Sequence, residues 1–231
     1  MRRRSSTTAT APGSQTSTAE PMPNPRRPDK YQQQARADGY EARSIYKLRE
    51  IDDKLRVIPK KGGILDLGCA PGSWSRFARE RGGPAVKIVG IDLQPVENYV
   101  GEAIEGSIMD VPAARFLELL GGRPRLVMSD MAPSTNGNKS SDHLRQIELV
   151  RMAFSVAQEV LAHDGAFVSK VFDGSEVPTL MAELKPWFRD MKRIRPESVR
   201  QESREFFIAC LGFKRPAGPA RDEIDAPAAV S

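Results

Sequence analysis

The stretch "LDLGCAPGSWS" (residues 65–75) joins an apolar run to a polar one through two glycines and a proline. The apolar segment "GGILDLG" (62–68) predicts a buried strand, and "SWSRFARERGG" (73–83) predicts a helix that ends at a glycine pair. Gly68 and Gly72 allow the backbone to turn tightly and to approach a ligand closely. This order of elements predicts an α/β fold that binds its ligand at the carboxyl end of the first strand.

The same stretch lacks the features of two common phosphate-binding motifs. It contains neither the G-x-G-x-x-G of dinucleotide sites nor the G-K-[ST] of a phosphate loop, and it reads D-x-G-x-x-P-G instead. Asp66 lies at the end of the first strand, and Asp92 ends the next one, where an acid suits the two hydroxyls of a ribose. These features indicate a nucleoside ligand such as S-adenosylmethionine. The competing interpretation is a generic tight turn with two surface acids.

Apolar segments of two periodicities alternate along the rest of the chain. The predicted helices are residues 44–55, 111–122, 142–161 and 176–188, and the predicted strands are residues 86–93, 102–108, 124–130 and 166–172. Short apolar strands between helices predict a mostly parallel sheet covered by helices on both faces. Two closing strands, 192–199 and 206–213, have only a brief turn between them, so they must be antiparallel. The expected fold is an α/β sandwich with an antiparallel last strand inserted near one edge.

Length and composition predict one folded domain between two tails. In a chain of 231 residues with net charge +5, residues 1–30 are a basic Pro/Ser/Thr-rich tail that we expect to be disordered. Residues 31–214 form the predicted domain, and residues 215–231 form a flexible tail rich in Pro and Ala. No run of about 18 apolar residues and no apolar signal region occur, so we expect a cytoplasmic protein without a membrane span.

Cysteine and histidine residues are too few and too scattered to predict a metal centre. Cys69 and Cys210 are expected to be reduced thiols, as is usual in the cytosol, and His143 and His163 to lie at exposed positions beside helices. No long apolar stripe is left unused, so we expect a monomer.

Lys170 stands inside the predicted strand "AFVSKVF" (166–172), where a buried charge needs a partner. The ordinary explanation is an edge strand with an outward lysine. However, Asp130 ends the preceding parallel strand in "VMSDMAPSTNG", so both residues are expected near one crevice. Glu205 at the start of the last strand and Lys47 on the first helix are further candidates.

Five segments occur in this order along the chain: "RSIYKL", "DLGCAPGSWS", "SDMAPSTNG", "FVSKVF" and "SREFF". Over about residues 36–214 they resemble the FtsJ-type ribosomal RNA 2′-O-methyltransferases, the large-subunit methyltransferase E family. The resemblance implies a Rossmann-like methyltransferase fold with S-adenosyl-L-methionine as cofactor. It implies a catalytic tetrad of Lys47, Asp130, Lys170 and Glu205. It implies cofactor contacts at Gly72, Trp74, Asp92 and Asp130.

One position departs from the family pattern. Many members have an acid near the adenine, in a Gly-Asp pair after the third strand, whereas this chain has Ser107 in "EGSIMD". Serine keeps a hydrogen-bonding group without the charge, and Asp110 lies three residues further on. Together with Asp66 and Gly68 of the glycine turn, Ser107 completes the predicted cofactor site.

The resemblance also implies a reaction and a substrate. A ribose 2′-oxygen would attack the methyl group of S-adenosylmethionine, with Lys170 as the general base or as the group that orients the hydroxyl. Asp130 would fix Lys170, while Lys47 and Glu205 would position the ribose. The implied substrate is a uridine in the A-loop of 23S rRNA within the assembled 50S subunit. RNA contacts are expected at Arg36, Arg43, Arg49 and Arg56 and in the basic segment 185–200.

Three other functions remain open at this point. A transfer-RNA anticodon-loop 2′-O-methyltransferase of the same family would share the chemistry, but the absence of an appended domain favours ribosomal RNA. A non-catalytic RNA-binding module would not need the four tetrad residues. A small-molecule methyltransferase would usually need a lid or a substrate domain, for which little sequence is left.

Overall fold

The computed structural model describes residues 30–40, 42–134, 137–200 and 203–215. Apart from Lys30, which begins the first helix, and Arg215, the predicted tails 1–30 and 215–231 lie outside the described residues, so their disorder stays a prediction. Within the described part of the chain, no helix is both long and apolar enough to cross a membrane.

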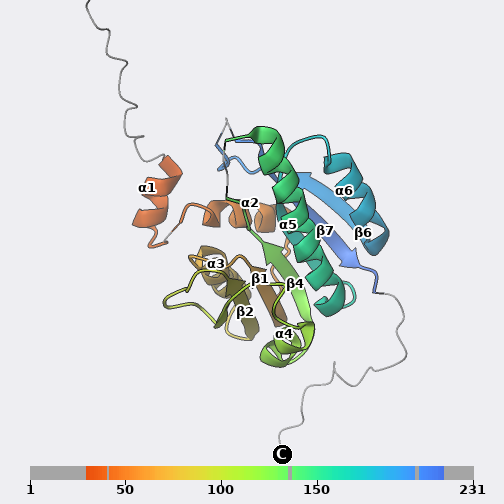
Figure 1. Ribbon diagram of the computed structural model, residues 1–231. Helices are drawn as coiled ribbons and strands as arrows, with labels where there is room; N and C mark the ends of the chain where they lie inside the picture. The colour runs from red at the N-terminus through yellow and green to blue at the C-terminus, as the bar shows by residue number, and fades with distance from the viewer. Residues whose placement is uncertain (1–29, 41, 135–136, 201–202, 216–231) are drawn as a thin grey trace, which may run out of the picture.

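Seven strands form one sheet, which Figure 1 shows between two layers of helices. The strands are β1 (Gly62–Leu67), β2 (Val86–Asp92), β3 (Glu102–Glu105), β4 (Pro124–Ser129), β5 (Ala166–Phe172), β6 (Phe188–Ile194) and β7 (Glu205–Phe213). Their order is β3-β2-β1-β4-β5-β7-β6, and β7 is antiparallel to both of its neighbours. The other described pairs are parallel. The predicted fold class, including the inserted antiparallel strand, is confirmed.

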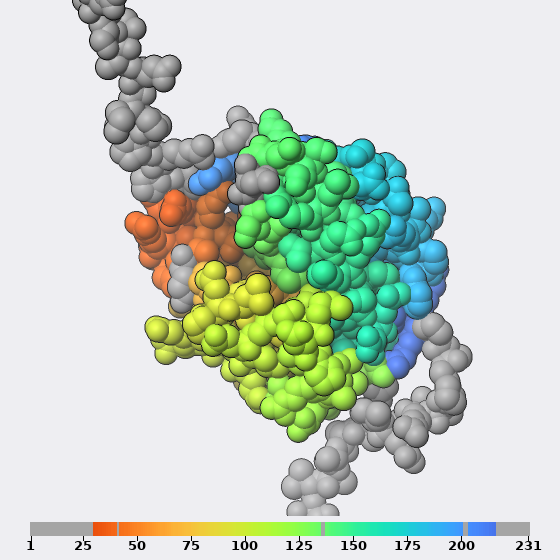
Figure 2. Space-filling view, in the orientation of Figure 1, coloured from red at the N-terminus to blue at the C-terminus, as the bar shows by residue number. Residues whose placement is uncertain are grey.

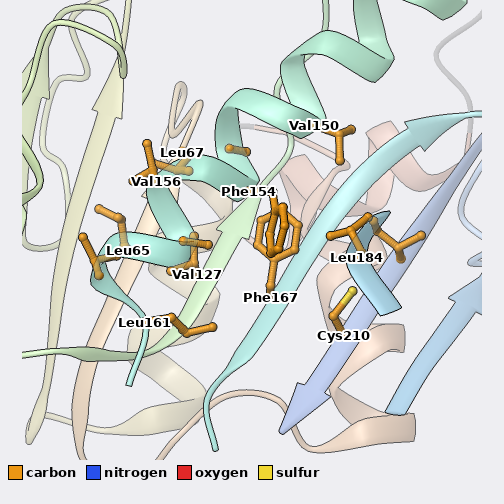
Figure 3. Packing of buried hydrophobic residues seen from close by; sticks show 14 of the residues in the cluster. Leu65, Leu67, Val127, Val150, Phe154, Val156, Leu161, Phe167, Leu184 and Cys210 are labelled. Atoms are coloured by element: carbon orange, nitrogen blue, oxygen red, sulfur yellow. The ribbon is translucent and has the colours of Figure 1, made fainter. Parts of the chain in front are cut away.

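The helices cover the two faces of the sheet in chain order. One face carries α1 (Lys30–Ala37), α2 (Ile45–Leu55) and α3 (Ser73–Gly82), and the other carries α4 (Ala113–Leu120), α5 (Lys139–Val160) and α6 (Val177–Leu184). Because successive side chains of a strand point to opposite faces, Leu65 packs in the cluster under α4–α6 while Ile64 packs under α1–α3. Figure 3 shows Phe154 of α5 against Phe167 of β5, with ring centroids 5.8 Å apart.

The strand order reverses between β1 and β4, since β2 and β3 extend the sheet on one side and β5 to β7 extend it on the other. Open α/β sheets bind ligands outside the carboxyl ends of their strands at such a reversal. The glycine turn after β1 and Asp130 after β4 both lie at this edge. The topology therefore brings together the loops that carry the predicted ligand-binding residues.

The boundary between the last helix and the next strand was predicted wrongly. The helix predicted at 176–188 ends at Leu184, a 3₁₀ turn η1 (Lys185–Trp187) follows, and β6 begins at Phe188 rather than at 192. Pro186 explains the helix end, because it has no N–H and disfavours a continuing helix. Phe188 packs on Phe213 with centroids 5.4 Å apart, which favours a strand there. The strand ends at Ile194, before Pro196.

Two further predictions need correction. The long helix starts at Lys139 instead of 142, because the Asn138 side chain caps it by accepting from the amides of Ser140 and Ser141. His143 is buried, not exposed, at 3% relative exposure. Its Nδ1–H donates to the carbonyl oxygen of Phe172 at 3.0 Å, and its Nε2 accepts from the amide of Glu176 at 3.1 Å. The histidine therefore fastens α5 to the turn after β5. His163 is exposed as predicted.

Candidate active site

A cavity of about 420 Å³ opens at the carboxyl edge of the sheet. Its walls come from the turns after β1, β2, β3 and β4 and from α5. In Figure 2 the yellow-green surface of the residues after β2 adjoins the green surface of α5. The cavity is lined by Gly68, Ala70, Pro71, Ile91, Asp92, Leu93, Gln94, Gly106, Ser107, Ile108, Asp130, Met131, Ala132, Leu149 and Met152. Four predicted site residues are thus among the lining: Gly68, Asp92, Ser107 and Asp130.

Gly68 brings two turns of the cavity wall into close contact. Its φ of +77° lies in the left-handed region, and a Cβ at this position would lie 2.4 Å from Met131 Cγ. The Gly68 amide donates to the carbonyl oxygen of Ile91 at 2.8 Å, which links the turn after β1 to the end of β2. A side chain at residue 68 would push the turns after β1 and β4 apart.

Asp92 holds two backbone segments at the wall of the cavity. Its Oδ2 accepts from the amide of Ala70 and its Oδ1 accepts from the amide of Gln94, both at 3.0 Å. An ionised carboxylate has about four lone-pair sites, so further donors can still bind there. Two exposed apolar side chains line the same cavity, Leu93 at 75% and Met152 at 38% relative exposure. This wall suits a ligand that has both hydroxyls and an apolar part.

Ser107 occupies the wall at the position where the sequence departs from the family pattern. Its Oγ accepts from the amide of Met109 at 3.2 Å, and Ser107 is part of the cavity lining. Asp110 is exposed, and it is not one of the described lining residues. The cavity wall therefore carries a neutral hydroxyl at this position rather than a carboxylate.

Asp66 lies behind the cavity and is not one of the described lining residues. Its Oδ2 accepts from Ser75 Oγ at 2.5 Å and from the Tyr99 hydroxyl at 3.5 Å. Burial raises the pKa of Asp66 to about 7, the charges of Asp130 and Asp92 act in the same direction, and the Ser75 hydrogen bond opposes them. Asp66 therefore links the end of β1 to α3 and to Tyr99.

The raised pKa predicts how stability depends on pH. A carboxyl that is easier to protonate in the folded protein stabilises the fold most at low pH, and this contribution is lost as the pH rises from about 4 through about 7. We expect urea unfolding of Asp66→Asn to show a shallower fall in stability over this range, by up to about 1.4 kcal/mol per pH unit. Parallel curves for both proteins would contradict the assignment.

Trp74 and Gly72 also lie outside the described lining of the cavity. The Trp74 indole is buried, and its Nε1–H donates to the carbonyl oxygen of Ser44 at 2.9 Å, just before α2. Its ring lies 5.7 Å from that of Phe207 on β7. Gly72 caps α3 with a φ of +103°. Trp74 therefore positions α2 and β7, and the cofactor contacts predicted for Gly72 and Trp74 stay predictions.

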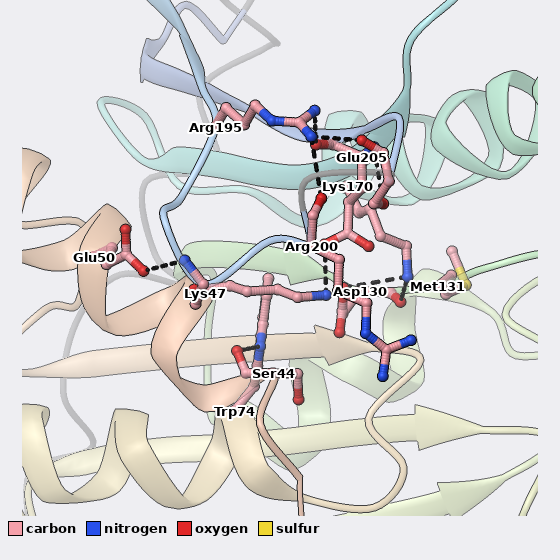
Figure 4. Close-up of polar contacts among 12 residues, drawn as sticks. Ser44, Lys47, Glu50, Trp74, Asp130, Met131, Lys170, Arg195, Arg200 and Glu205 are labelled. Atoms are coloured by element: carbon pink, nitrogen blue, oxygen red, sulfur yellow. Dashed lines mark hydrogen bonds and ion pairs between the residues drawn. The ribbon is translucent and has the colours of Figure 1, made fainter. Parts of the chain in front are cut away.

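The four tetrad residues form two adjacent ion pairs (Figure 4). Lys170 Nζ lies 3.2 Å from Asp130 Oδ1 and donates to the carbonyl oxygen of Asp130 at 2.5 Å. Lys47 Nζ lies 2.5 Å from Glu205 Oε1. The side chains of Lys170 and Lys47 are only 7% and 8% exposed, respectively. A buried cation needs a partner of opposite charge, and each lysine has a carboxylate beside it. Lys170 has the partner that the sequence predicted for it.

Gln146 of α5 is a site residue that the sequence reasoning missed. Its buried Nε2 donates to the carbonyl oxygen of Lys170 at 2.9 Å and to that of Met131 at 3.2 Å. It thereby ties the backbone of Lys170 to the residue after Asp130. The signal was present, because Gln146 is a polar residue four positions before Val150, within the apolar stripe of the helix.

The predicted RNA-contacting arginines have unequal environments. Arg36 and Arg56 are exposed, whereas Arg49 is half-buried over the ring of Tyr46 at 5.1 Å. Several cations of segment 185–200 have acidic partners nearby: Arg189 pairs with Asp164, Lys192 with Asp190 at 3.0 Å, and Arg193 with Asp173 at 2.8 Å. This segment is therefore less basic at its surface than its sequence indicates.

Within the described ranges, no group of three or more His, Cys, Asp or Glu side chains is arranged to hold a metal ion.

Comparisons with known proteins agree with this geometry. The family model described as FtsJ-like methyltransferase matches residues 40–213. The Ribosomal RNA large subunit methyltransferase E of Caulobacter sp. strain K31 is 44% identical over 188 residues, which cover 80% of this chain and 82% of that protein. The protein of the same name from Anaeromyxobacter dehalogenans is 42% identical over 208 residues, covering 87% and 78% of the two chains.

A solved structure gives the same result for the fold. It is described as a ribosomal RNA methyltransferase from Plasmodium falciparum, and it matches with a TM-score of 0.68 and 30% identity. The match covers 75% of this chain and 98% of that one. The chain belongs to the FtsJ-like methyltransferase family.

Proposed function

We propose that this protein transfers a methyl group from S-adenosyl-L-methionine to the 2′-oxygen of a ribose in large-subunit ribosomal RNA. The substrate would be a uridine of the 23S A-loop, within the assembled 50S subunit. The observation that carries the proposal is the buried Lys170–Asp130 pair beside a cavity with nucleoside-binding features. The names of the similar proteins support ribosomal RNA as the substrate. We expect the protein to act in the cytoplasm as a monomer.

The cavity residues fit S-adenosylmethionine. Asp92 has lone pairs left for the two ribose hydroxyls after it binds the amides of Ala70 and Gln94. Leu93 and Met152 offer apolar surface for the adenine, and Ser107 offers a hydrogen-bonding group. When bound, the cofactor supplies an electrophilic methyl group.

The protein's own residues prepare the nucleophile. The reacting form of Lys170 is the neutral amine, because an ammonium cannot accept a proton. Its Nζ then takes the proton of the 2′-hydroxyl, since a hydroxyl is a poor nucleophile until this proton is removed. Asp130 holds Lys170 through its carboxylate and its carbonyl oxygen, and Gln146 holds the Lys170 backbone. Lys47 and Glu205 position the ribose from the neighbouring pair. Correct placement of two reactants contributes roughly 7–11 kcal/mol to such a reaction.

Asp92→Asn should weaken cofactor binding. An amide group in this position loses acceptor sites and directs an N–H toward a backbone N–H, because both carboxylate oxygens now accept from amides. We expect the Kd for S-adenosylmethionine to rise by about tenfold or more, which is the usual loss for one charge-assisted hydrogen bond. Isothermal titration calorimetry measures this. The variant Gln94→Asn serves as a control at the same wall, and an unchanged Kd for Asp92→Asn would contradict the role.

The proposed function is tested with labelled S-adenosylmethionine and large ribosomal subunits from a strain that lacks this activity, with transfer RNA in parallel. We expect label in the large-subunit RNA, retained in an alkali-resistant 2′-O-methyl dinucleotide. Label in transfer RNA alone would keep the chemistry and replace the substrate. If neither RNA were labelled although the protein bound the cofactor, the non-catalytic RNA-binding module would be the better explanation.

A further inference from the structure

Glu50 joins α2 to a segment far away in the sequence. Its carboxylate accepts hydrogen bonds from two consecutive backbone amides, those of Glu197 at 2.6 Å and Ser198 at 3.0 Å. Both belong to the β6–β7 connection, which the structure describes at residues 195–200 and 203–204. Hydrogen bonds to a carboxylate are stronger than neutral ones, and Glu50 lies one helical turn after Lys47.

Arg195 fastens the same connection from its other side. Its guanidinium donates to the carbonyl oxygens of Ser203 at 2.5 Å, Glu205 at 3.1 Å and Arg200 at 3.2 Å. The planar guanidinium carries five N–H donors, so it can gather several carbonyls at once. Arg195 thereby folds the connection back onto the start of β7, where Glu205 lies.

These contacts form a closed ring with the catalytic group. From Lys47 the ring passes to Glu205 through their ion pair, then through Arg195 along the connection to Glu50, and back along α2. Figure 4 shows these side chains around the site. Although the connection is irregular, three of the residues that the structure describes in it are buried: Pro196, Ser198 and Val199. The described part of the connection is therefore anchored both to α2 and to the start of β7.

We propose that Glu50 is a positioning residue for the RNA substrate, which holds the β6–β7 connection as a wall beside Lys47 and Glu205. This inference rests on the proposed function. The connection meets the site through Glu205 and through α2, and none of its described residues lines the cofactor cavity, so we assign it to the RNA side of the site. Glu50 is an acid beside the site of a polyanionic substrate, where its charge opposes binding. Its contribution is therefore geometric.

The charge of Glu50 and its positioning role should affect RNA binding in opposite directions, so the two can be told apart. Removal of an acidic charge near the site should tighten RNA binding if charge alone mattered, whereas loss of positioning should weaken it. For Glu50→Gln we expect the KM for 50S subunits to rise about tenfold, which corresponds to one charge-assisted hydrogen bond, and the Kd for S-adenosylmethionine to stay within about twofold. Asp53→Asn is the matched control, because it removes the same charge from an exposed position on the same helix. Its KM should be unchanged or lower.

Two further measurements complete the test. Arg195→Lys keeps the positive charge but loses the planar guanidinium that binds several carbonyl oxygens at once. We therefore expect it to raise the KM for 50S subunits as Glu50→Gln does. Hydrogen exchange followed by mass spectrometry should show the amides of Glu197 and Ser198 exchanging about tenfold faster in Glu50→Gln. Unchanged exchange, or a KM for Glu50→Gln that is unchanged or lower, as expected for Asp53→Asn, would overturn the inference. If the wild-type protein labelled no RNA, the proposed function would fail and this inference with it, whereas labelled RNA with unchanged exchange would overturn the positioning role alone.

Discussion

Replacing Lys170 by alanine is expected to lower kcat by about 10³-fold, within the range that general acid–base catalysis contributes. The side chain is held by the carboxylate and the carbonyl oxygen of Asp130, and alanine leaves no group at this point to take the proton of the 2′-hydroxyl. Lys170 is not one of the described lining residues of the cofactor cavity, so the Kd for S-adenosylmethionine should stay nearly unchanged. Single-turnover methylation of 50S subunits and calorimetry measure the two quantities.

Lys170→Arg separates the two roles of the lysine. Arginine keeps a positive charge beside Asp130 but remains protonated, so it can orient a hydroxyl and cannot accept its proton. If Lys170 is the base, Lys170→Arg should be as inactive as Lys170→Ala. If Lys170 only orients the hydroxyl, Lys170→Arg should recover part of the activity. Methylation by Lys170→Ala at a rate near that of the wild-type protein would remove Lys170 from the reaction altogether.

The sequence predicted the sheet well because local chemistry decides most of it. Short apolar runs separated by glycine turns have few alternatives to a parallel sheet, and the connection before β7 is too short for a parallel crossover, so β7 must be antiparallel. The predicted partnership of Lys170 and Asp130 follows from the same topology, because β4 and β5 are parallel neighbours and the register pairs Ser129, just before Asp130, with Ser169, just before Lys170. The position of a residue at a strand end is thus readable from a single sequence.

Contacts between residues far apart in the sequence could not be predicted from local patterns. β6 begins four residues before its predicted start, because the helix ends before Pro186 and the packing of Phe188 on Phe213 favours a strand there. Glu50 binds amides 147 residues away, and no local pattern marks a side chain whose partners are backbone groups. The indole N–H of Trp74 donates to the backbone just before α2, a contact that no local pattern predicted. Side-chain partners that depend on tertiary packing are the part that sequence alone does not determine.

Variants of the second ion pair, Lys47 with Glu205, should distinguish what the pair contributes to stability from what it contributes to activity. Lys47 and Glu205 are largely buried, and the Lys47 ammonium lies over the ring of Phe207 at 5.7 Å. Removal of one partner leaves the other charge uncompensated, so we expect Lys47→Met and Glu205→Gln each to lower the free energy of unfolding by about 3 kcal/mol. In the double variant no unpaired charge remains, and we expect it to be more stable than either single variant. Urea unfolding of all four proteins measures the coupling.

Activity should not return with stability in the double variant. If Lys47 and Glu205 position the ribose, both single variants and the double variant should methylate 50S subunits far more slowly than the wild-type protein, although the double variant folds well. Asp53→Asn, which changes an exposed charge on the same helix, is the control for general effects of charge on α2. Two outcomes would count against this account: stability losses that simply add in the double variant would show that the pair is not coupled, and recovered methylation would show that the pair serves the fold and not the substrate.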